Sequence, residues 1–138
     1  MEIKQISVFL ENNVGRLGEV TQVLAGKGVN LRAISIADTK DFGILRLIVN
    51  DHSLAQNALN EAGFTTRLSE VVAIEIDDKP GSLSKVIQLF SENMVNIEYL
   101  YASLEGKSDK AVVIFKLENY EKGLKILNEN RVSMINSF

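Results

Sequence analysis

The stretch "NNVGRLGEV" at residues 12–20 has a counterpart in "DKPGSLSKV" at residues 78–86, with Gly, Leu and Val at the same positions. Each copy follows a run that reads as a strand and leads into a run with helical spacing of apolar residues. Aligning Gly15 with Gly81 also aligns Asn30 with Asn96, further along the chain. A repeat that extends this far predicts two copies of one folded unit.

The first copy predicts a strand, a helix, two strands and then another helix and strand. "KQISVFL" at 4–10 alternates apolar and other residues, and residues 16–27 carry apolar side chains at helical spacing before the stop "GKG". The β-branched run 29–37, the turn 38–43 and the apolar run 44–49 predict a hairpin. Asp51 and Ser53 are N-cap candidates for a helix that ends near Gly63, and residues 64–69 predict a last strand.

The second copy repeats this order, with strands at 71–76, 95–104, 111–117 and 131–138 and helices at 82–93 and 120–129. The order βαββαβ, twice, predicts an α+β fold of two ferredoxin-like units in tandem, with antiparallel sheets and the helices on one face. We expect the domains to be residues 1–69 and 70–138.

The amino-acid composition argues against several classes of function. A formal net charge of −3 and a sequence pI near 5.2 argue against a nucleic-acid binder, which needs basic surface to displace counterions. The absence of Cys excludes disulfides and thiolate chemistry. No apolar run approaches the length that spans a bilayer, and the N-terminus lacks the pattern of a signal peptide, so we expect a cytoplasmic protein without membrane contact.

Several functions of the ferredoxin-like fold fit poorly. Metal-binding versions need a Cys-x-x-Cys motif, and RNA-binding versions stack bases on aromatic side chains that "ILRLIV" lacks. Arg16 and Asn30 resemble the phosphate-binding Arg and water-orienting Asn of acylphosphatase, but the second copy has Ser82 in place of Arg. No catalytic triad, metal cluster or carboxylate pair is evident, so we expect neither an enzyme nor a cofactor.

The repeated loop has the chemistry to hold a zwitterion. Gly15 and Gly81 stand before helices whose first N–H groups lack intrahelical partners and favour an anion. Asn12 and Asp78 offer oxygens for an ammonium group. A purely architectural role, in which each glycine makes only a tight turn, explains the same residues and stays open at this point.

The two loops resemble the ACT domain, a regulatory module of amino-acid metabolism, through its Asp/Asn-x-Pro-Gly-x-Leu loop and a later Asn-Ile. The resemblance covers nearly the whole chain as a tandem pair, although Val14 stands where the family usually has Pro. It implies an effector site for an amino acid. The implied ligand-binding residues are Asn12, Asn13, Val14, Gly15, Arg16, Leu17, Asn30 and Leu31 in copy one, and Asp78, Lys79, Pro80, Gly81, Ser82, Leu83, Asn96 and Ile97 in copy two.

We therefore expect a non-catalytic sensor or regulatory subunit that binds an amino acid at these loops, with a partner enzyme of amino-acid metabolism. The alternative is a module that contacts a partner protein and holds no ligand. Arg16 favours the first loop for the carboxylate. Leu17 and Leu83 are expected in the core. Phe115, Tyr99 and Tyr101 predict an apolar sheet face that a homodimer would cover.

Overall fold

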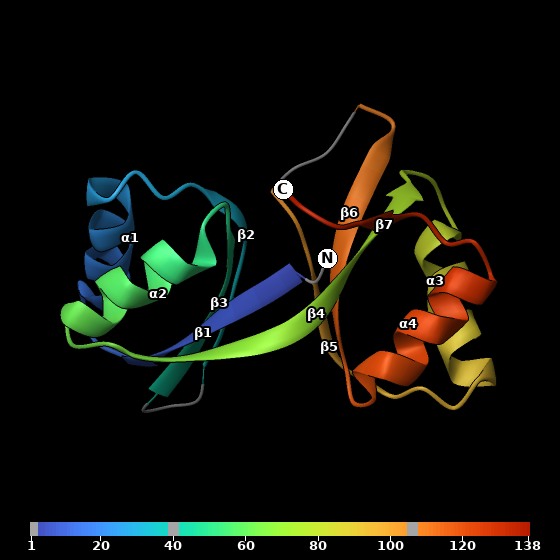
Figure 1. Ribbon diagram of the computed structural model, residues 1–138, viewed down its shortest axis with the longest axis horizontal. Helices are drawn as coiled ribbons and strands as arrows, with labels where there is room; N and C mark the ends of the chain where they lie inside the picture. Colours follow the sequence, from blue (N-terminus) through green and yellow to red (C-terminus); the bar gives the residue numbers. More distant parts are fainter. Residues whose placement is uncertain (1–2, 39–41, 105–107) are drawn as a thin grey trace. The chain divides into compact units, whose positions relative to one another are not determined.

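The computed structural model describes residues 3–38, 42–104 and 108–138 (Figure 1). The chain divides into two compact units, which are essentially residues 4–69 and 70–137. The predicted α+β fold with two βαββαβ-like units is confirmed. The centre of the predicted turn 38–43 lies outside the described residues.

The first unit contains β1 (Ile3–Glu11), α1 (Arg16–Gly26), β2 (Leu31–Asp38), β3 (Phe42–Val49), α2 (His52–Glu61) and the start of β4 (Thr65–Asp77). Its strand order is β2-β3-β1-β4, with antiparallel pairing of β3 to both β1 and β2. α1 and α2 lie together on one face of this sheet (Figure 1). The alternating residues Ile6, Val8 and Leu10 point into the core beneath them, as the sequence predicts.

The second unit contains the later residues of β4, then α3 (Ser82–Glu92), β5 (Ile97–Ala102), β6 (Lys110–Leu117), α4 (Tyr120–Glu129) and β7 (Met134–Ile135). β4 pairs with β6, β6 pairs with β5, and β7 pairs with β4, all antiparallel. α3 and α4 lie on one face (Figure 1). Their core includes Phe90 and Phe115, whose ring centroids are 5.5 Å apart.

Two strand predictions needed correction. Residues 64–69 and 71–76, expected as separate strands, form the single 13-residue strand β4, because no Gly, Pro or Asn interrupts the β-forming residues between them. The last strand, expected over 131–138, shortens to Met134–Ile135. Arg131 has a φ of 53°, which is not an extended conformation and delays the start of pairing.

Three core or surface predictions were also wrong. Leu17, expected in the core, is 41% exposed, whereas its counterpart Leu83 is partly buried against the second core. Phe115, expected on an exposed sheet face, is fully buried because its side chain points to the helix side of β6. Tyr101 is also buried, and its ring stacks on that of Tyr99.

The helix ends differ between the units. In the first unit, glycines occupy the positive-φ positions after both helices, with Gly28 at 72° after α1. In the second unit, Met94 follows α3 with a φ of 58° and Arg131 follows α4 with a φ of 53°. A residue with a Cβ is strained in this left-handed region, whereas glycine is not.

We expect Met94→Gly to raise the free energy of unfolding by about 0.5–1 kcal/mol, because relief of strain exceeds the added flexibility of the unfolded chain. Met94 is 83% exposed, so its removal loses little packing. The matched change Gly28→Met should lower the same free energy by about 1 kcal/mol or more. Urea unfolding followed by circular dichroism measures both. A loss of stability in Met94→Gly would contradict the expectation.

Candidate functional site

Each unit has two distinct ends. Gly15 immediately precedes α1 and Asn30 follows the end of this helix, while Gly81 and Asn96 flank α3 in the same way. Each helix has 11 residues, which corresponds to about 16 Å at ~1.5 Å per residue. The predicted site residues of one copy therefore lie at two opposite ends of the unit, which we call the glycine end and the asparagine end.

The backbone has the same conformation at the glycine ends of the two units. Gly15 has φ 90° and ψ −13°, and Gly81 has φ 89° and ψ −13°. No side chain caps α1 or α3 at this point, whereas the side chains of Asp51 and Asn119 cap α2 and α4. The N–H groups of Arg16 and Ser82 donate to the carbonyls of Asn13 and Lys79 at 3.3 Å. The N–H groups of the next two residues in each helix have no intrahelical partner and can meet an anion.

In the first unit, the loop's polar side chains are bonded to neighbours. The Asn13 side chain donates to the Glu11 carboxylate at 3.0 Å. The guanidinium of Arg16 pairs with Glu19 at 2.7 Å and lies over the ring of Phe64, 4.6 Å from its centroid. The cation that the sequence suggested for a ligand carboxylate is therefore already engaged by a carboxylate of its own helix.

In the second unit, the glycine end opens into a hollow of about 510 Å³. It gathers residues from the end of β4, the loop and first turns of α3, the start of β6 and the segment after α4. Its charged residues are Lys79, Lys85, Lys110, Arg131, Glu75 and Asp77, and the other lining residues are Ile76, Ser82, Val86, Asn130, Val132 and Ser133. Of the residues predicted from the sequence, Lys79 and Ser82 line this hollow.

One ion pair organises the charges of the hollow. Lys110 binds the Asp77 carboxylate across the β4–β6 register, and Lys79 lies 3.7 Å from the same carboxylate. The hydrogen bond and charge of Lys110 lower the pKa of Asp77, and Asp77 in turn raises the pKa of Lys110. Both groups are therefore charged at neutral pH, and the pair is lost as the pH falls through the lowered pKa of Asp77 or rises through the raised pKa of Lys110.

The remaining positive charge comes from Lys85 and Arg131. Among the residues that the structure describes, neither side chain forms an ion pair. Lys85 stands in the first turns of α3, where an anion bound to the helix N-terminus would meet it. The hollow therefore combines free helix N–H groups and unpaired cations with the carboxylates of Glu75 and Asp77.

The two glycine ends differ in charge at corresponding positions. The repeat and the strand register place Lys79, Lys85, Lys110 and Arg131 of the second unit where the first unit has Asn13, Glu19, Phe42 and Gly63. The first unit instead exposes large apolar side chains at this end, namely Phe9, Val14, Leu17, Ile36 and Phe42. The same loop conformation is therefore surrounded by basic side chains in the second unit and by exposed apolar side chains in the first.

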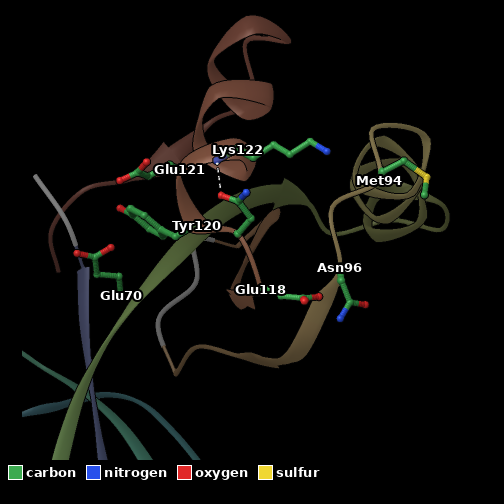
Figure 2. A pocket seen from close by; sticks show the side chains of 8 residues that line it. Glu70, Met94, Asn96, Glu118, Tyr120, Glu121 and Lys122 are labelled. Carbon is green, nitrogen blue, oxygen red and sulfur yellow. Dashed lines mark hydrogen bonds between the residues drawn. The ribbon is translucent and has the colours of Figure 1, made fainter.

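The asparagine end of the second unit holds a different hollow, of about 620 Å³ (Figure 2). Asn96, Glu118 and Tyr120 line it from the start of β5 and the segment that leads into α4, with Glu70 on β4 and Met94 after α3. The Asn119 side chain accepts a hydrogen bond from the Lys122 amide, at 3.1 Å. Glu70, Glu118 and Glu121 make this lining mainly acidic.

The structure describes every residue of the predicted site. In each copy these residues fall into two groups at opposite ends of the unit, so they do not form one site. Asp78, Pro80 and Gly81 lie in the loop between β4 and α3 and Leu83 lies in the first turn of α3, but none of the four lines the glycine-end hollow. Asn96 and Ile97 lie at the other end of α3. In the first unit, the backbone N–H of Asn30 bonds the side chain of Asn50, and Leu31 begins β2. Asn12, Asn13, Val14 and Gly15 form the loop before α1, and Arg16 and Leu17 begin that helix.

Sequence reasoning missed Lys85, Lys110 and Arg131. A signal for Lys85 was present, because the repeat aligns it with Glu19 and this reversal of charge marks a difference between the loops. Lys110 and Arg131 reach the loop only through strand register and the path after α4. Within the described ranges, no group of three or more potential ligand side chains could hold a metal ion, and no helix is long and apolar enough to cross a membrane.

Comparison with known proteins relates the whole chain to one family. A family model described as an ACT domain pair matches residues 1–137. The solved protein BT0572 from Bacteroides thetaiotaomicron is 41% identical with a TM-score of 0.92, and the match covers 98% of this chain and 92% of that one. No curated protein matches the chain.

Two further solved structures share the fold at lower identity. The regulatory subunit of aspartate kinase from Thermus thermophilus, in its ligand-free form, is 19% identical with a TM-score of 0.67, and the match covers 93% of this chain and 91% of that one. The corresponding subunit from Thermus flavus is 19% identical with a TM-score of 0.64, over 94% and 92% of the two chains.

Proposed function

Because this chain belongs to the ACT domain pair family, we propose that it is a non-catalytic regulatory protein that binds an amino acid at the glycine end of its second unit. The observation that carries this proposal is the uncapped N-terminus of α3, which opens into a hollow with both cations and carboxylates on its walls. A free amino acid carries both charges and needs both kinds of partner.

The ligand's carboxylate fits at the start of α3. The first-turn N–H groups there have no intrahelical partners, and Lys85 adds a charge that no described carboxylate neutralises. The ammonium group fits against Glu75 on the same lining, because the Asp77 carboxylate is already bound by Lys110. This assignment moves the favoured loop from the first copy to the second, because Arg16 is paired with Glu19.

A thermal-shift screen of the standard amino acids at about 10 mM tests for binding, because a ligand of the native state raises the apparent melting temperature. For an amino acid that binds, Lys85→Gln should weaken the calorimetric affinity roughly tenfold, the equivalent of ~1.4 kcal/mol. Lys125→Gln on α4 is the matched control. It changes the same charge in the same unit, outside the hollow, and should leave the affinity unchanged.

The alternative function is a module that contacts a partner protein without a ligand. The large apolar side chains that the first unit exposes towards its glycine end favour it, because exposed apolar surface of this kind can be covered by a partner protein. A related fold serves as the regulatory subunit of aspartate kinase, so an enzyme of amino-acid metabolism is a reasonable partner class. Failure of every amino acid to shift the melting temperature would overturn the ligand proposal and leave this one.

A further inference from the structure

The hollow at the glycine end of the second unit has a surplus of positive charge. Four basic and two acidic side chains line it, although the whole chain has a formal net charge of −3. The basic residues come from the loop before α3, from α3, from the start of β6 and from the segment after α4, and they are Lys79, Lys85, Lys110 and Arg131. None of their counterparts in the first unit is basic, so the fold itself does not require this charge.

Most of these charges can be matched with one another. The Asp77 carboxylate binds Lys110 and lies 3.7 Å from the amine of Lys79. The groups left over are one acid and two bases, namely Glu75, Lys85 and Arg131. Within the ranges that the structure describes, none of these three side chains forms an ion pair.

An amino acid with a neutral side chain uses only two of the three remaining groups. Its carboxylate would meet Lys85 and the start of α3, and its ammonium group would meet Glu75. Arg131 would then stand on the same lining without a counter-charge. A ligand that displaces water from an uncompensated cation incurs a free-energy cost, and a second anionic group on the ligand removes that cost.

The backbone holds Arg131 at this lining. The N–H of Glu75 on β4 donates to the Ser133 carbonyl at 2.9 Å, and the N–H of Arg131 donates to the Asn128 carbonyl at the end of α4, at 3.2 Å. The segment between α4 and β7 is therefore fixed at both of its ends. A guanidinium placed in this way can bind both oxygens of one carboxylate in a single plane.

We propose that the ligand of this hollow is an acidic amino acid, whose α-carboxylate lies at the start of α3 and whose side-chain carboxylate is bound by Arg131. This inference rests on the proposed function of the same hollow and names the class of amino acid. The volume of about 510 Å³ falls in the usual range of ligand sites and has room for aspartate or glutamate. Arg131 is then the residue that selects acidic over neutral amino acids.

Glutamate and glutamine provide a direct test, because they differ by one charge and hardly in shape. In calorimetry on the full chain at low ionic strength, we expect L-glutamate to bind at least about tenfold more tightly than L-glutamine. Equal affinities, or tighter binding of glutamine, would overturn the acidic ligand and leave the proposed amino-acid site in place. If no standard amino acid binds, the inference and the proposed function both fail.

Glutarate separates the two carboxylates from the ammonium group. It carries both acid groups of glutamate but has no amine, so it offers nothing to Glu75. We expect glutarate to bind about fivefold or more weakly than L-glutamate. Equal affinities would overturn the assignment of an amino acid but not that of a second carboxylate.

Variants of Arg131 test its role in selection. Arg131→Gln keeps a Cβ at the φ of 53°, so the backbone strain is unchanged, and folding is checked by circular dichroism. It should weaken L-glutamate about tenfold and leave L-glutamine within about twofold, whereas Lys85→Gln should weaken both ligands alike. Arg67→Gln on β4, outside the hollow, is the matched control and should change neither affinity.

The fork of the guanidinium can be tested separately from its charge. Arg131→Lys keeps the positive charge but loses the planar pair of donors, so its affinity for L-glutamate should fall between those of the original protein and Arg131→Gln. If Arg131→Gln weakens both amino acids equally, or neither, Arg131 does not select the ligand and the proposal is overturned.

Discussion

Replacing Phe90 by alanine is expected to lower the free energy of unfolding of the second unit by about 3–5 kcal/mol. The Phe90 side chain is fully buried on α3, and its ring meets that of Phe115 on β6 at a tilt of 60°. Removal of the ring loses its burial and leaves a cavity between helix and sheet that rigid neighbours fill only in part. This is a large fraction of the stability of a small unit.

The measurement is urea unfolding followed by circular dichroism, because the chain contains no Trp for fluorescence. Phe90→Leu introduces the residue found at the corresponding position of the first unit, Leu24, and should cost less than about 1.5 kcal/mol. Leu104→Ala, at a side chain that is 65% exposed, should change stability by less than about 0.5 kcal/mol. A loss below about 1.5 kcal/mol for Phe90→Ala would show that the contact with Phe115 is not a packing centre.

Much of the fold could be predicted because local patterns and the repeat agreed. The alternation of Ile6, Val8 and Leu10 and the turn before α1 each indicate one element, and their recurrence after residue 70 constrains the second unit. The errors occurred where tertiary packing decides. Phe115 lies in a continuous apolar strand, and such a run does not reveal which face each residue takes.

Leu17 illustrates a different limit. Its helical spacing with Val20 and Leu24 suggests a common face, yet it lies in the first turn of α1, at the margin of the surface that the helix covers. Its counterpart Leu83 is partly buried in the second unit. Identical spacing therefore gave different burial, because the residues packed around each helix start differ between the units.

The site was only partly predictable for a geometrical reason. The sequence predicts a site at the loop before each helix, but it cannot show that Asn96 lies a helix length away from Gly81, beside a separate hollow. Nor can it show that Lys110 and Arg131 join Lys79 at one end. These residues are distant in the sequence and meet only through the β4–β6 register and the path that follows α4.

The two loop glycines allow a controlled test of which loop binds. We expect Gly81→Val to reduce the affinity for the ligand found by screening at least about tenfold, because the side chain would stand next to the first turn of α3, where we propose that the carboxylate binds. Gly15→Val should leave the affinity unchanged if the second unit alone binds. Both glycines have nearly the same φ and ψ, and a Cβ on either would meet nothing within 4 Å.

Because Gly15 and Gly81 have the same backbone conformation, comparing their variants separates an effect on ligand affinity from an effect on stability. At a φ near 90° a branched side chain is strained wherever it stands, so both variants should lose a similar free energy of unfolding, about 1–2 kcal/mol. Calorimetry on folded protein then reports the loop alone, and Gly81→Ala with Gly15→Ala provides a milder pair if either valine variant unfolds. Weakening by the Gly15 variant alone would assign the ligand to the first loop. Unchanged affinity in both folded variants would mean that the repeated loop has only a structural role and that the amino acid binds elsewhere.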